Sequence, residues 1–190
     1  MFHDLAEETR SVRRFRENER ITEQQLLTFI NSARLAPCGA NLQLLRFTPV
    51  SDGTHCARIF PALKWAGYLE DWNGPAEGSR PPAYIIIHNP IEERRHIPVD
   101  AGIAAAYIVL AARESGYGSC MIMSFDAGMI KAAAGTPDGY APFLIIALGV
   151  PDEEIVLEEA DGDIRYYRDG KDRHHVPKLA LDSLIESVKD

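Results

Sequence analysis

Apolar side chains at helical spacing predict a first helix after Thr22. Thr22 and Gln25 match a capping box, in which each side chain satisfies a free backbone N–H of the first turn. Pro37 is expected to end the helix, because the residue before a proline is pushed out of the α region. The apolar positions that carry the pattern are Leu26, Leu27, Ile30 and Ala33.

Capping residues and apolar periodicity predict three further helices. Asp100 is expected to cap a helix whose C-terminal glycine is Gly116. Asp126 is expected to cap a short helix that ends near Gly135. The last helix is predicted from apolar spacing over Val176–Val188.

Short apolar runs rich in β-branched residues predict the strands, and the glycine- and proline-rich segment Asp71–Pro82 reads as a loop. Helices and strands are interspersed without a regular βαβ rhythm. The sequence therefore predicts an α+β or mixed α/β fold, with one sheet flanked by helices, in a single domain over residues 1–190. The predicted strands are Leu44–Val50, Ala83–His88, Gly118–Met123, Pro142–Gly149 and, more weakly, Ile164–Arg168.

Composition narrows the class of partner. The chain has 190 residues, is 46% hydrophobic and carries a net charge of −8, which disfavours binding to nucleic acid or to an anionic membrane surface. Three cysteines without C-x-x-C spacing favour neither a disulfide framework nor a metal cluster, and they suit a reducing compartment. No apolar run reaches the ~18–20 residues of a membrane span, and the first residues lack a signal-peptide pattern. We expect a soluble, cytoplasmic protein that acts on a small molecule.

The segment Arg10–Phe15 is the first candidate site. Arg10 and Arg13 supply fixed positive charge and Ser11 a small hydroxyl, which together suit a phosphate or an electron-rich ring edge. The same residues also fit a solvated basic turn, since charged side chains are usually exposed.

The segment Ala36–Gln43 is the second candidate. Gly39 allows a backbone to approach a ligand closely, and the amides of Asn41 and Gln43 can both donate and accept hydrogen bonds, as a flavin edge requires. The alternative is an ordinary helix exit with polar loop residues. Cys38 is expected to be an inert thiol, because no histidine can be placed beside it from sequence.

Two further motifs have simpler interpretations. Gly116–Asp126 contains G-x-G, but it lacks the third glycine and opens a strand, so it does not match a Rossmann dinucleotide site. His174 and His175 are adjacent and have no third ligand spaced near them, so no metal site is expected. Lys178 is either a phosphate anchor or an exposed side chain.

The order and spacing of these segments resemble the FMN-dependent nitroreductase family, also called flavin-reductase-like, in its short-chain branch. The resemblance covers nearly the whole chain. One departure is Thr9, where the family opens with an arginine. The matching segments are Thr9–Phe15 for R-R-S-[IV]-R-x-F, Ala36–Gln43 for A-P-S-x-x-N-x-Q, Asp100–Gly102 for D-x-G, Gly116–Cys120 for G-L-G-x-C, Ala147–Glu153 for a-L-G-x-P-x-E, and Tyr167–Asp169 with His175–Lys178 at the close.

The resemblance implies a nitroreductase-like fold, with a mixed and mainly antiparallel sheet flanked by helices, in an intertwined homodimer that binds FMN between subunits. It implies that the arginine motif meets the phosphate and the pyrimidine edge, and that the A-P-S segment reaches the flavin of the partner. Arg13 and Ser124 are the expected catalytic residues, with the backbone N–H of Ser124 facing flavin N5. The expected cofactor-binding residues are Arg10, Ser11, Arg13, Pro37, Cys38, Gly39, Asn41, Gln43, Met121, Ile122, Met123, Ser124 and Lys178.

The implied activity is transfer of hydride from NADH or NADPH, through flavin N5, to a small organic acceptor such as a nitroaromatic or a quinone. Turnover would be ping-pong, because donor and acceptor occupy the same space in turn. Two alternatives stay open at this point. One is a flavin-binding family member with other chemistry, such as dehalogenation, flavin breakdown or ring dehydrogenation. The other is a non-enzymatic flavin carrier.

Overall fold

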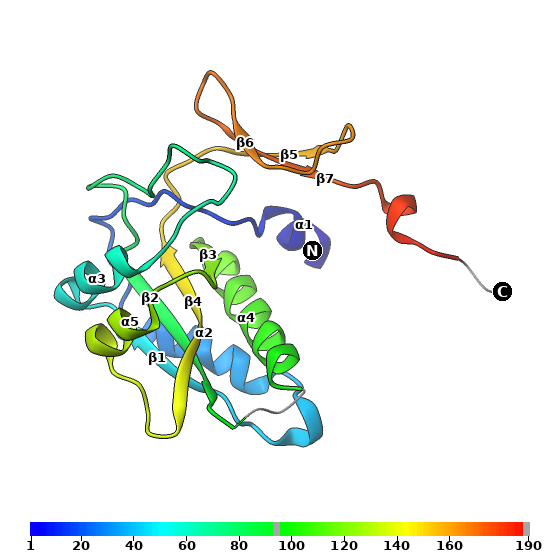
Figure 1. Ribbon diagram of the computed structural model, residues 1–190. Helices are drawn as coiled ribbons and strands as arrows, with labels where there is room; N and C mark the ends of the chain where they lie inside the picture. The colour runs from blue at the N-terminus through cyan, green and yellow to red at the C-terminus, as the bar shows by residue number, and fades with distance from the viewer. Residues whose placement is uncertain (93–95, 188–190) are drawn as a thin grey trace.

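The computed structural model describes residues 1–92 and 96–187 and shows an α+β architecture (Figure 1). The α-helices are α1 (Phe2–Glu8), α2 (Glu23–Leu35), α3 (Gly53–Ile59), α4 (Ile97–Glu114) and α5 (Ala127–Ala134), and the short 3₁₀ helices are η1 (Gly39–Asn41), η2 (Phe60–Ala62) and η3 (Leu181–Leu184). The strands are β1 (Arg46–Val50), β2 (Ala83–Pro90), β3 (Gly118–Ile122), β4 (Tyr140–Gly149), β5 (Ile155–Glu159), β6 (Tyr167–Arg168) and β7 (His174–Lys178).

The main sheet has the order β1-β2-β4-β3, and every pairing within it is antiparallel. Its two central strands are buried on both faces, so their sequences are almost continuously apolar. Alternate residues of β2 therefore enter different cores: Tyr84 and Ile86 enter one, and Ile85 and Ile87 enter the other. The predicted α+β fold with a mainly antiparallel sheet flanked by helices is confirmed, although the main sheet is wholly antiparallel and not mixed.

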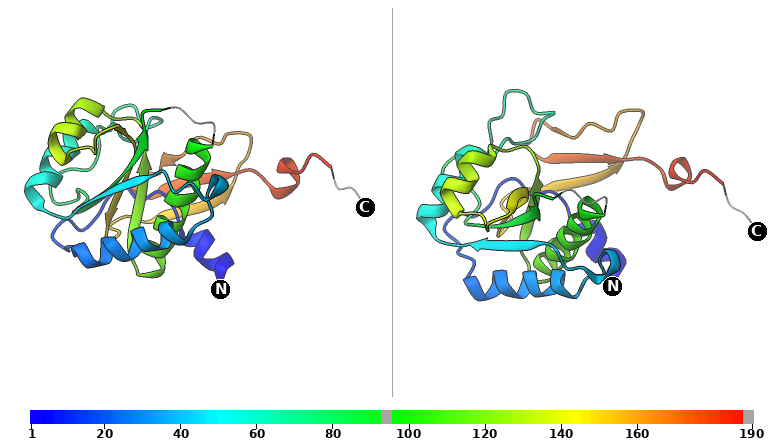
Figure 2. Two further views of the ribbon diagram at one scale, coloured as in Figure 1. Left: turned by 90° about the horizontal axis from the view of Figure 1, so that it is seen from below. Right: turned by 60° about the horizontal axis from the view of Figure 1, so that its bottom comes forward.

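Each face of the sheet is covered by its own helices (Figure 2). Helices α2 and α4 pack together over one face, and α3 and α5 pack together over the other. Helix α2 begins as predicted, because Thr22 accepts from the Gln25 N–H while the Gln25 side chain accepts from the Thr22 N–H. Helix α4 ends as predicted in a Schellman motif, with Gly116 at φ +84°.

The segment that follows α1 crosses the end of the main sheet. Ser11 forms a parallel bridge with Ser119 of β3, and Phe15 forms an antiparallel bridge with Pro151. Gly149 makes this crossing possible, because a Cβ there would lie 2.7 Å from the Phe15 ring. The N-terminal arginine motif is thus fixed against the sheet by close backbone packing.

The C-terminal residues form a second, three-stranded sheet in the order β5-β7-β6, with β5 parallel to β7. The predicted helix over 176–188 is wrong within the described residues, while position 188 lies outside them. Pro177 disfavours a helix interior, and two neighbouring strands hold β7 extended. Beyond β7 the chain extends away from the body (Figure 1), and Leu181 is 71% exposed.

Other differences from the sequence prediction have local causes. Helix α4 begins at Ile97 and not after Asp100, because Pro98 stands in the first turn, where a proline needs no donor. Strand β1 begins two residues later than predicted, at Arg46, and β2 and β4 are longer than predicted. Strand β5 and helices α1 and α3 were not predicted. No helix in the described part of the chain combines the length and the apolar character that crossing a membrane requires.

Candidate functional site

The N-terminal arginine motif lies beside β3, at the C-terminal end of α4. Arg113 in the last turn of α4 bonds to Glu8 at 2.9 Å, and the Val12 N–H donates to Ser119 at 2.9 Å. Arg10 donates from one Nη to the Ala6 carbonyl at 2.7 Å, but its buried Nε has no partner among the described residues. Ser11 lies between Arg10 and Val12, and the hydrogen bonds of these two residues fix the segment.

Arg13 is held by residues from the C-terminal sheet. Its side chain is buried, and its Nη1 lies 2.9 Å from His174 Nε2 and 3.2 Å from the Ser11 carbonyl. Its Cζ stands 4.6 Å from the ring centroid of Tyr166. The backbone N–H of Arg13 donates to Glu153, whose other carboxylate oxygen accepts from Arg168 at 2.6 Å. No carboxylate among the described residues forms an ion pair with the Arg13 guanidinium, because Glu153 pairs with Arg168 instead.

The predicted flavin-facing segment Met121–Ser124 leaves the end of β3. Ile122 is buried in the core, whereas Met121 and Met123 are 48% and 64% exposed. This alternation follows from the strand, because successive side chains point to opposite faces. The Ser124 carbonyl accepts from the Lys64 N–H at 2.9 Å, while no acceptor in residues 1–92 and 96–187 bonds to the Ser124 N–H.

The predicted segment Pro37–Gln43 lies at the other end of α4. Gly39 donates its N–H to Oδ1 of buried Asp100 at 2.8 Å, and a Cβ at Gly39 would lie 3.0 Å from the His96 ring. Left-handed backbone occurs at Ala40, Asn41 and Gln43, with φ of +48°, +54° and +51°. The loop is therefore a tightly wound turn that a carboxylate fixes to the helix.

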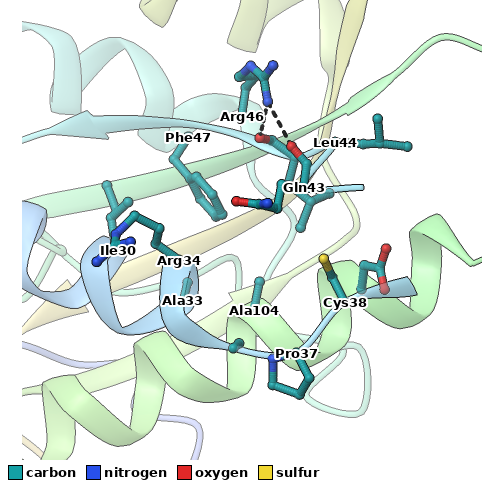
Figure 3. Close-up of a pocket in the computed structure, with 13 residues that line it drawn as sticks. Ile30, Ala33, Arg34, Pro37, Cys38, Gln43, Leu44, Arg46, Phe47 and Ala104 are labelled. Atoms are coloured by element: carbon teal, nitrogen blue, oxygen red, sulfur yellow. Dashed lines mark hydrogen bonds between the residues drawn. The ribbon is translucent and has the colours of Figure 1, made fainter. Parts of the chain in front are cut away.

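A pocket of about 300 Å³ opens beside this turn, between α2, α4 and the start of β1. Figure 3 shows Pro37 and Cys38 on one side of the pocket and Gln43 and Leu44 on the other. Its volume is at the lower end of the range for small-ligand pockets. The remaining lining residues are Ile30, Ala33, Arg34, Ala36, Leu45, Arg46, Phe47, Asp100 and Ala104.

Helix α4 separates the two groups of predicted site residues. Asp100, which holds Gly39, lies in its first turn, and Arg113, which holds Glu8, lies in its last. At ~1.5 Å per residue these two positions are roughly 20 Å apart along the helix. One chain therefore brings Arg10, Ser11 and Arg13 together near β3, but it does not bring the Pro37–Gln43 segment to them.

Lys178 is exposed at the end of β7. Its backbone carbonyl accepts from the Ala160 N–H at 2.7 Å, whereas its ammonium group has no hydrogen bond or ion pair with the described residues. It lies four residues beyond His174, or roughly 13 Å along the strand. His174 and His175 point to opposite faces: one contacts Arg13, and the other bonds to Glu158 at 2.8 Å. Among residues 1–92 and 96–187, no group of three histidine, cysteine or acidic side chains could hold a metal ion.

Two titratable groups near Arg13, His174 and Cys120, are held in their neutral forms. Burial and the neighbouring Arg13 charge lower the pKa of His174 to about 4. Burial raises the pKa of the Cys120 thiol to about 11. Neither group carries a charge near pH 7, and the Cys120 thiol is therefore a poor nucleophile.

A comparison with known protein families identifies the family of this chain. Residues 6–150 match the model of the nitroreductase family. The chain belongs to the nitroreductase family. No curated protein matches the chain significantly by sequence.

Solved nitroreductase-family structures share the fold. A nitroreductase family protein from Clostridium novyi NT is 26% identical, with a TM-score of 0.68, over 80% of this chain and 86% of that one. An FMN-dependent nitroreductase from Clostridium difficile R20291 is 27% identical, with a TM-score of 0.63, over 79% and 87%. A Staphylococcus epidermidis protein provisionally named an NAD(P)H:FMN oxidoreductase shares the fold at 19% identity, with a TM-score of 0.72, over 99% and 96%.

Four contributors to the site were not found by sequence reasoning. Asp100 reads as a helix cap in the sequence but in the structure holds Gly39, and His96 packs on the same glycine. Tyr166 and His174 contact Arg13 from a distant part of the chain. The sequence signalled His174 only through the paired histidine motif, which indicated nothing about Arg13, and it gave no signal for Tyr166.

The lowered pKa of His174 predicts that the stability of the protein depends on pH. A histidine of the unfolded chain titrates near ~6.5, whereas folded His174 titrates at about 4. Between these values the unfolded chain binds a proton that the folded chain does not. The free energy of unfolding therefore falls as pH falls through this window, by up to about 1.4 kcal/mol per pH unit from this group.

The measurement is urea unfolding of the protein and of His174→Gln at pH 7 and pH 5. We expect the variant to lose less stability than the parent between these two pH values. The histidine that follows supplies a contribution of opposite sign, because Glu158 raises the pKa of His175, but it is present in both proteins. An equal loss in both proteins would show that folded His174 is protonated at pH 5.

Proposed function

We propose that this nitroreductase-family protein is an FMN-dependent oxidoreductase that works as a homodimer. It takes hydride from NADH or NADPH and delivers it to a small organic acceptor, such as a nitroaromatic or a quinone. The observation that carries the proposal is the separation of two complementary half-sites by the length of α4. The flavin nature of the ligand is supported by the family and by the name of the Clostridium difficile relative.

The residues present fit FMN by their chemistry. Arg10 and Arg13 each have a buried Nε without a partner, and a buried donor of this kind is costly unless something binds it. A phosphate or a flavin pyrimidine edge accepts from such donors. Exposed Met121 and Met123 offer soft apolar surface of the type that covers a ring.

Each half-site has a defined role in this proposal. Arg10, Ser11 and Lys178 hold the phosphate, and Arg13 sets positive charge at the pyrimidine edge. The free N–H of Ser124 faces flavin N5. FMN, when bound, supplies the redox chemistry by accepting a hydride and passing it on. The segment that reaches in from the partner subunit consists of Pro37, Cys38 and Gly39, with the amides of Asn41 and Gln43 beside it.

Exposed apolar residues support the homodimer. The extended chain after β7 presents Leu179, Leu181 and Ile185, which find no core within their own subunit. On α4, Val99 and Tyr107 are exposed on the surface of the helix. Such apolar surface is typical of the interfaces of obligate dimers. We propose that both surfaces are buried between two copies of the chain.

We also propose ping-pong turnover, because the electron donor and the acceptor would occupy the same space beside bound FMN in turn. We propose that residues 1–190 act as one domain, and that the protein is cytoplasmic, where Cys38, Cys56 and Cys120 stay reduced.

The first experiment is flavin identification and reduction. We expect purified protein to be yellow, to release FMN on denaturation, and to bleach rapidly when NADH or NADPH is added without oxygen. Rapid bleaching separates a reductase from a flavin carrier. Protein that stays colourless after incubation with FMN would overturn the proposed function.

Subunit complementation tests the shared site. Arg13→Ala removes one half-site, and Gly39→Val removes the other by forcing a side chain against His96. In a mixed dimer of the two variants, one of the two sites is intact. We expect each variant alone to lose most FMN binding. Because random exchange makes half of the dimers mixed, we expect an equimolar mixture to recover about a quarter of the wild-type sites, and purified mixed dimer about half, measured by flavin fluorescence quenching.

Recovery in the mixture requires that the two segments come from different chains. If neither variant alone weakens FMN binding, these residues do not form the site. If both weaken it but the mixture, with exchange verified by mass spectrometry, shows no recovery, each site is built within one chain.

Two substitutions at Ser124 distinguish a role of its backbone N–H from a role of its side chain. Ser124→Ala keeps the N–H and should retain most of the reduction rate, whereas Ser124→Pro removes the N–H and should lower the rate about 10- to 100-fold. The Ser124 carbonyl that accepts from Lys64 is present in both variants. Stopped-flow reduction of folded, flavin-loaded protein is the measurement, with thermal unfolding as the control. A parental rate for Ser124→Pro would move the N5 contact to another residue.

A further inference from the structure

Arg13 has a flexible side chain, yet its contacts define one orientation. It leaves an irregular segment between α1 and α2, so no helix or strand fixes it locally. Its guanidinium is instead held by the His174 ring at 2.9 Å and by the face of Tyr166 at 4.6 Å. Both partners come from the C-terminal residues beyond the segment that matches the family model.

We propose that His174 is the positioning residue for Arg13: its neutral imidazole orients the guanidinium toward the cofactor without cancelling its charge. This inference rests on the proposed function, in which Arg13 faces FMN. His174 itself touches no reacting atom, so it acts through the arginine. Tyr166 serves as the second wall of the same cradle.

The direction of the hydrogen bond follows from the chemistry of the two groups. An arginine can only donate, so His174 Nε2 must accept, and the imidazole proton resides on Nδ1. That Nδ1 is buried and has no partner among the described residues. A second proton on the ring would place two cations 2.9 Å apart, which the buried environment disfavours.

A histidine suits this task better than a carboxylate would. Glu153 is the nearest acidic group that contacts this segment, but it accepts from the backbone N–H of Arg13 and pairs its side chain with Arg168. In the described part of the chain, no carboxylate forms an ion pair with the Arg13 guanidinium. A glutamate at position 174 would orient the arginine equally well and would neutralise it.

The contact also links cofactor binding to the C-terminal sheet. The ring centroid of Tyr166 lies 5.3 Å from that of His174 and 4.9 Å from that of Tyr68, both in tilted arrangements, and the Tyr166 hydroxyl accepts from the Tyr68 N–H at 3.3 Å. The loop that carries Tyr68 is thereby tied to the same group of side chains. Orientation of Arg13 thus depends on two segments remote from it in sequence.

Three substitutions at position 174 separate orientation from charge. His174→Gln retains an acceptor, His174→Leu removes it, and His174→Glu retains it but adds a negative charge. We expect FMN affinity to stay within about threefold for the glutamine, and to fall about tenfold or more for the leucine. We expect the glutamate to lower the midpoint potential of bound FMN. The shift is about 30 mV for each tenfold decrease in the affinity for reduced FMN relative to oxidised FMN.

His175→Leu is the matched control. This residue is the next one on β7 and is also buried, at 9% exposure against 0% for His174, but it bonds to Glu158 and does not contact Arg13. It should lower thermal stability without changing the potential or the FMN dissociation constant. Tyr166→Leu provides a second variant at a half-buried loop position, and it should weaken FMN binding even where a His174 substitution lowers the yield of folded protein.

The outcomes separate this inference from the proposed function. If the parent protein binds no FMN, the proposed function fails and this inference fails with it. If Arg13→Ala weakens FMN binding while the His174 and Tyr166 variants match the His175 control, only the positioning role is wrong. Near-parental FMN affinity for the glutamine, weakened affinity for the leucine and a lowered potential for the glutamate, with the control unchanged in both measurements, is the result that supports it.

Discussion

The rigid length of helix α4 is the constraint on which the rest of the structure depends. Its inward face is fully buried against the main sheet and α2, so the helix can neither bend nor slide without opening that core. Asp100 near its start holds the Pro37–Gln43 turn, and Arg113 near its end holds α1 and the arginine motif that follows. The helix therefore sets the spacing between the two groups of predicted site residues, and in the proposed function two chains combine to bring them together.

This arrangement couples folding, association and ligand binding. The apolar chain end and the exposed residues of α4 lack partners within one subunit, and the buried Nε atoms of Arg10 and Arg13 lack acceptors. In the proposed dimer, a second subunit would cover the apolar residues and an electron-rich ligand would accept from the arginine Nε atoms. A ligand bound between subunits would then stabilise the folded chain and the dimer together, by mass action.

The sequence predicted those elements whose signal is local. The capping box at Thr22, the glycine at Gly116 and the buried run of β4 are each decided by a few neighbouring residues, and all three are confirmed. The helix over 176–188 failed because its apolar spacing belongs to an extended chain whose strand neighbours lie elsewhere in the sequence. Periodicity cannot distinguish a helix from a strand when long-range pairing decides.

The candidate site likewise combines features with a local sequence signal and features that depend on long-range contacts. Residue types in the arginine motif and in Ala36–Gln43 indicated chemistry from sequence, and the structure shows which of them lie together. It could not be predicted that His174, which lies 161 positions from Arg13, would orient it, or that Asp100 would bind a loop amide instead of capping its helix. Both are contacts between a short-range motif and a distant side chain. A positive charge kept free in an acidic protein needs such a neutral partner, and a neutral partner leaves no charge pattern in the sequence by which to find it.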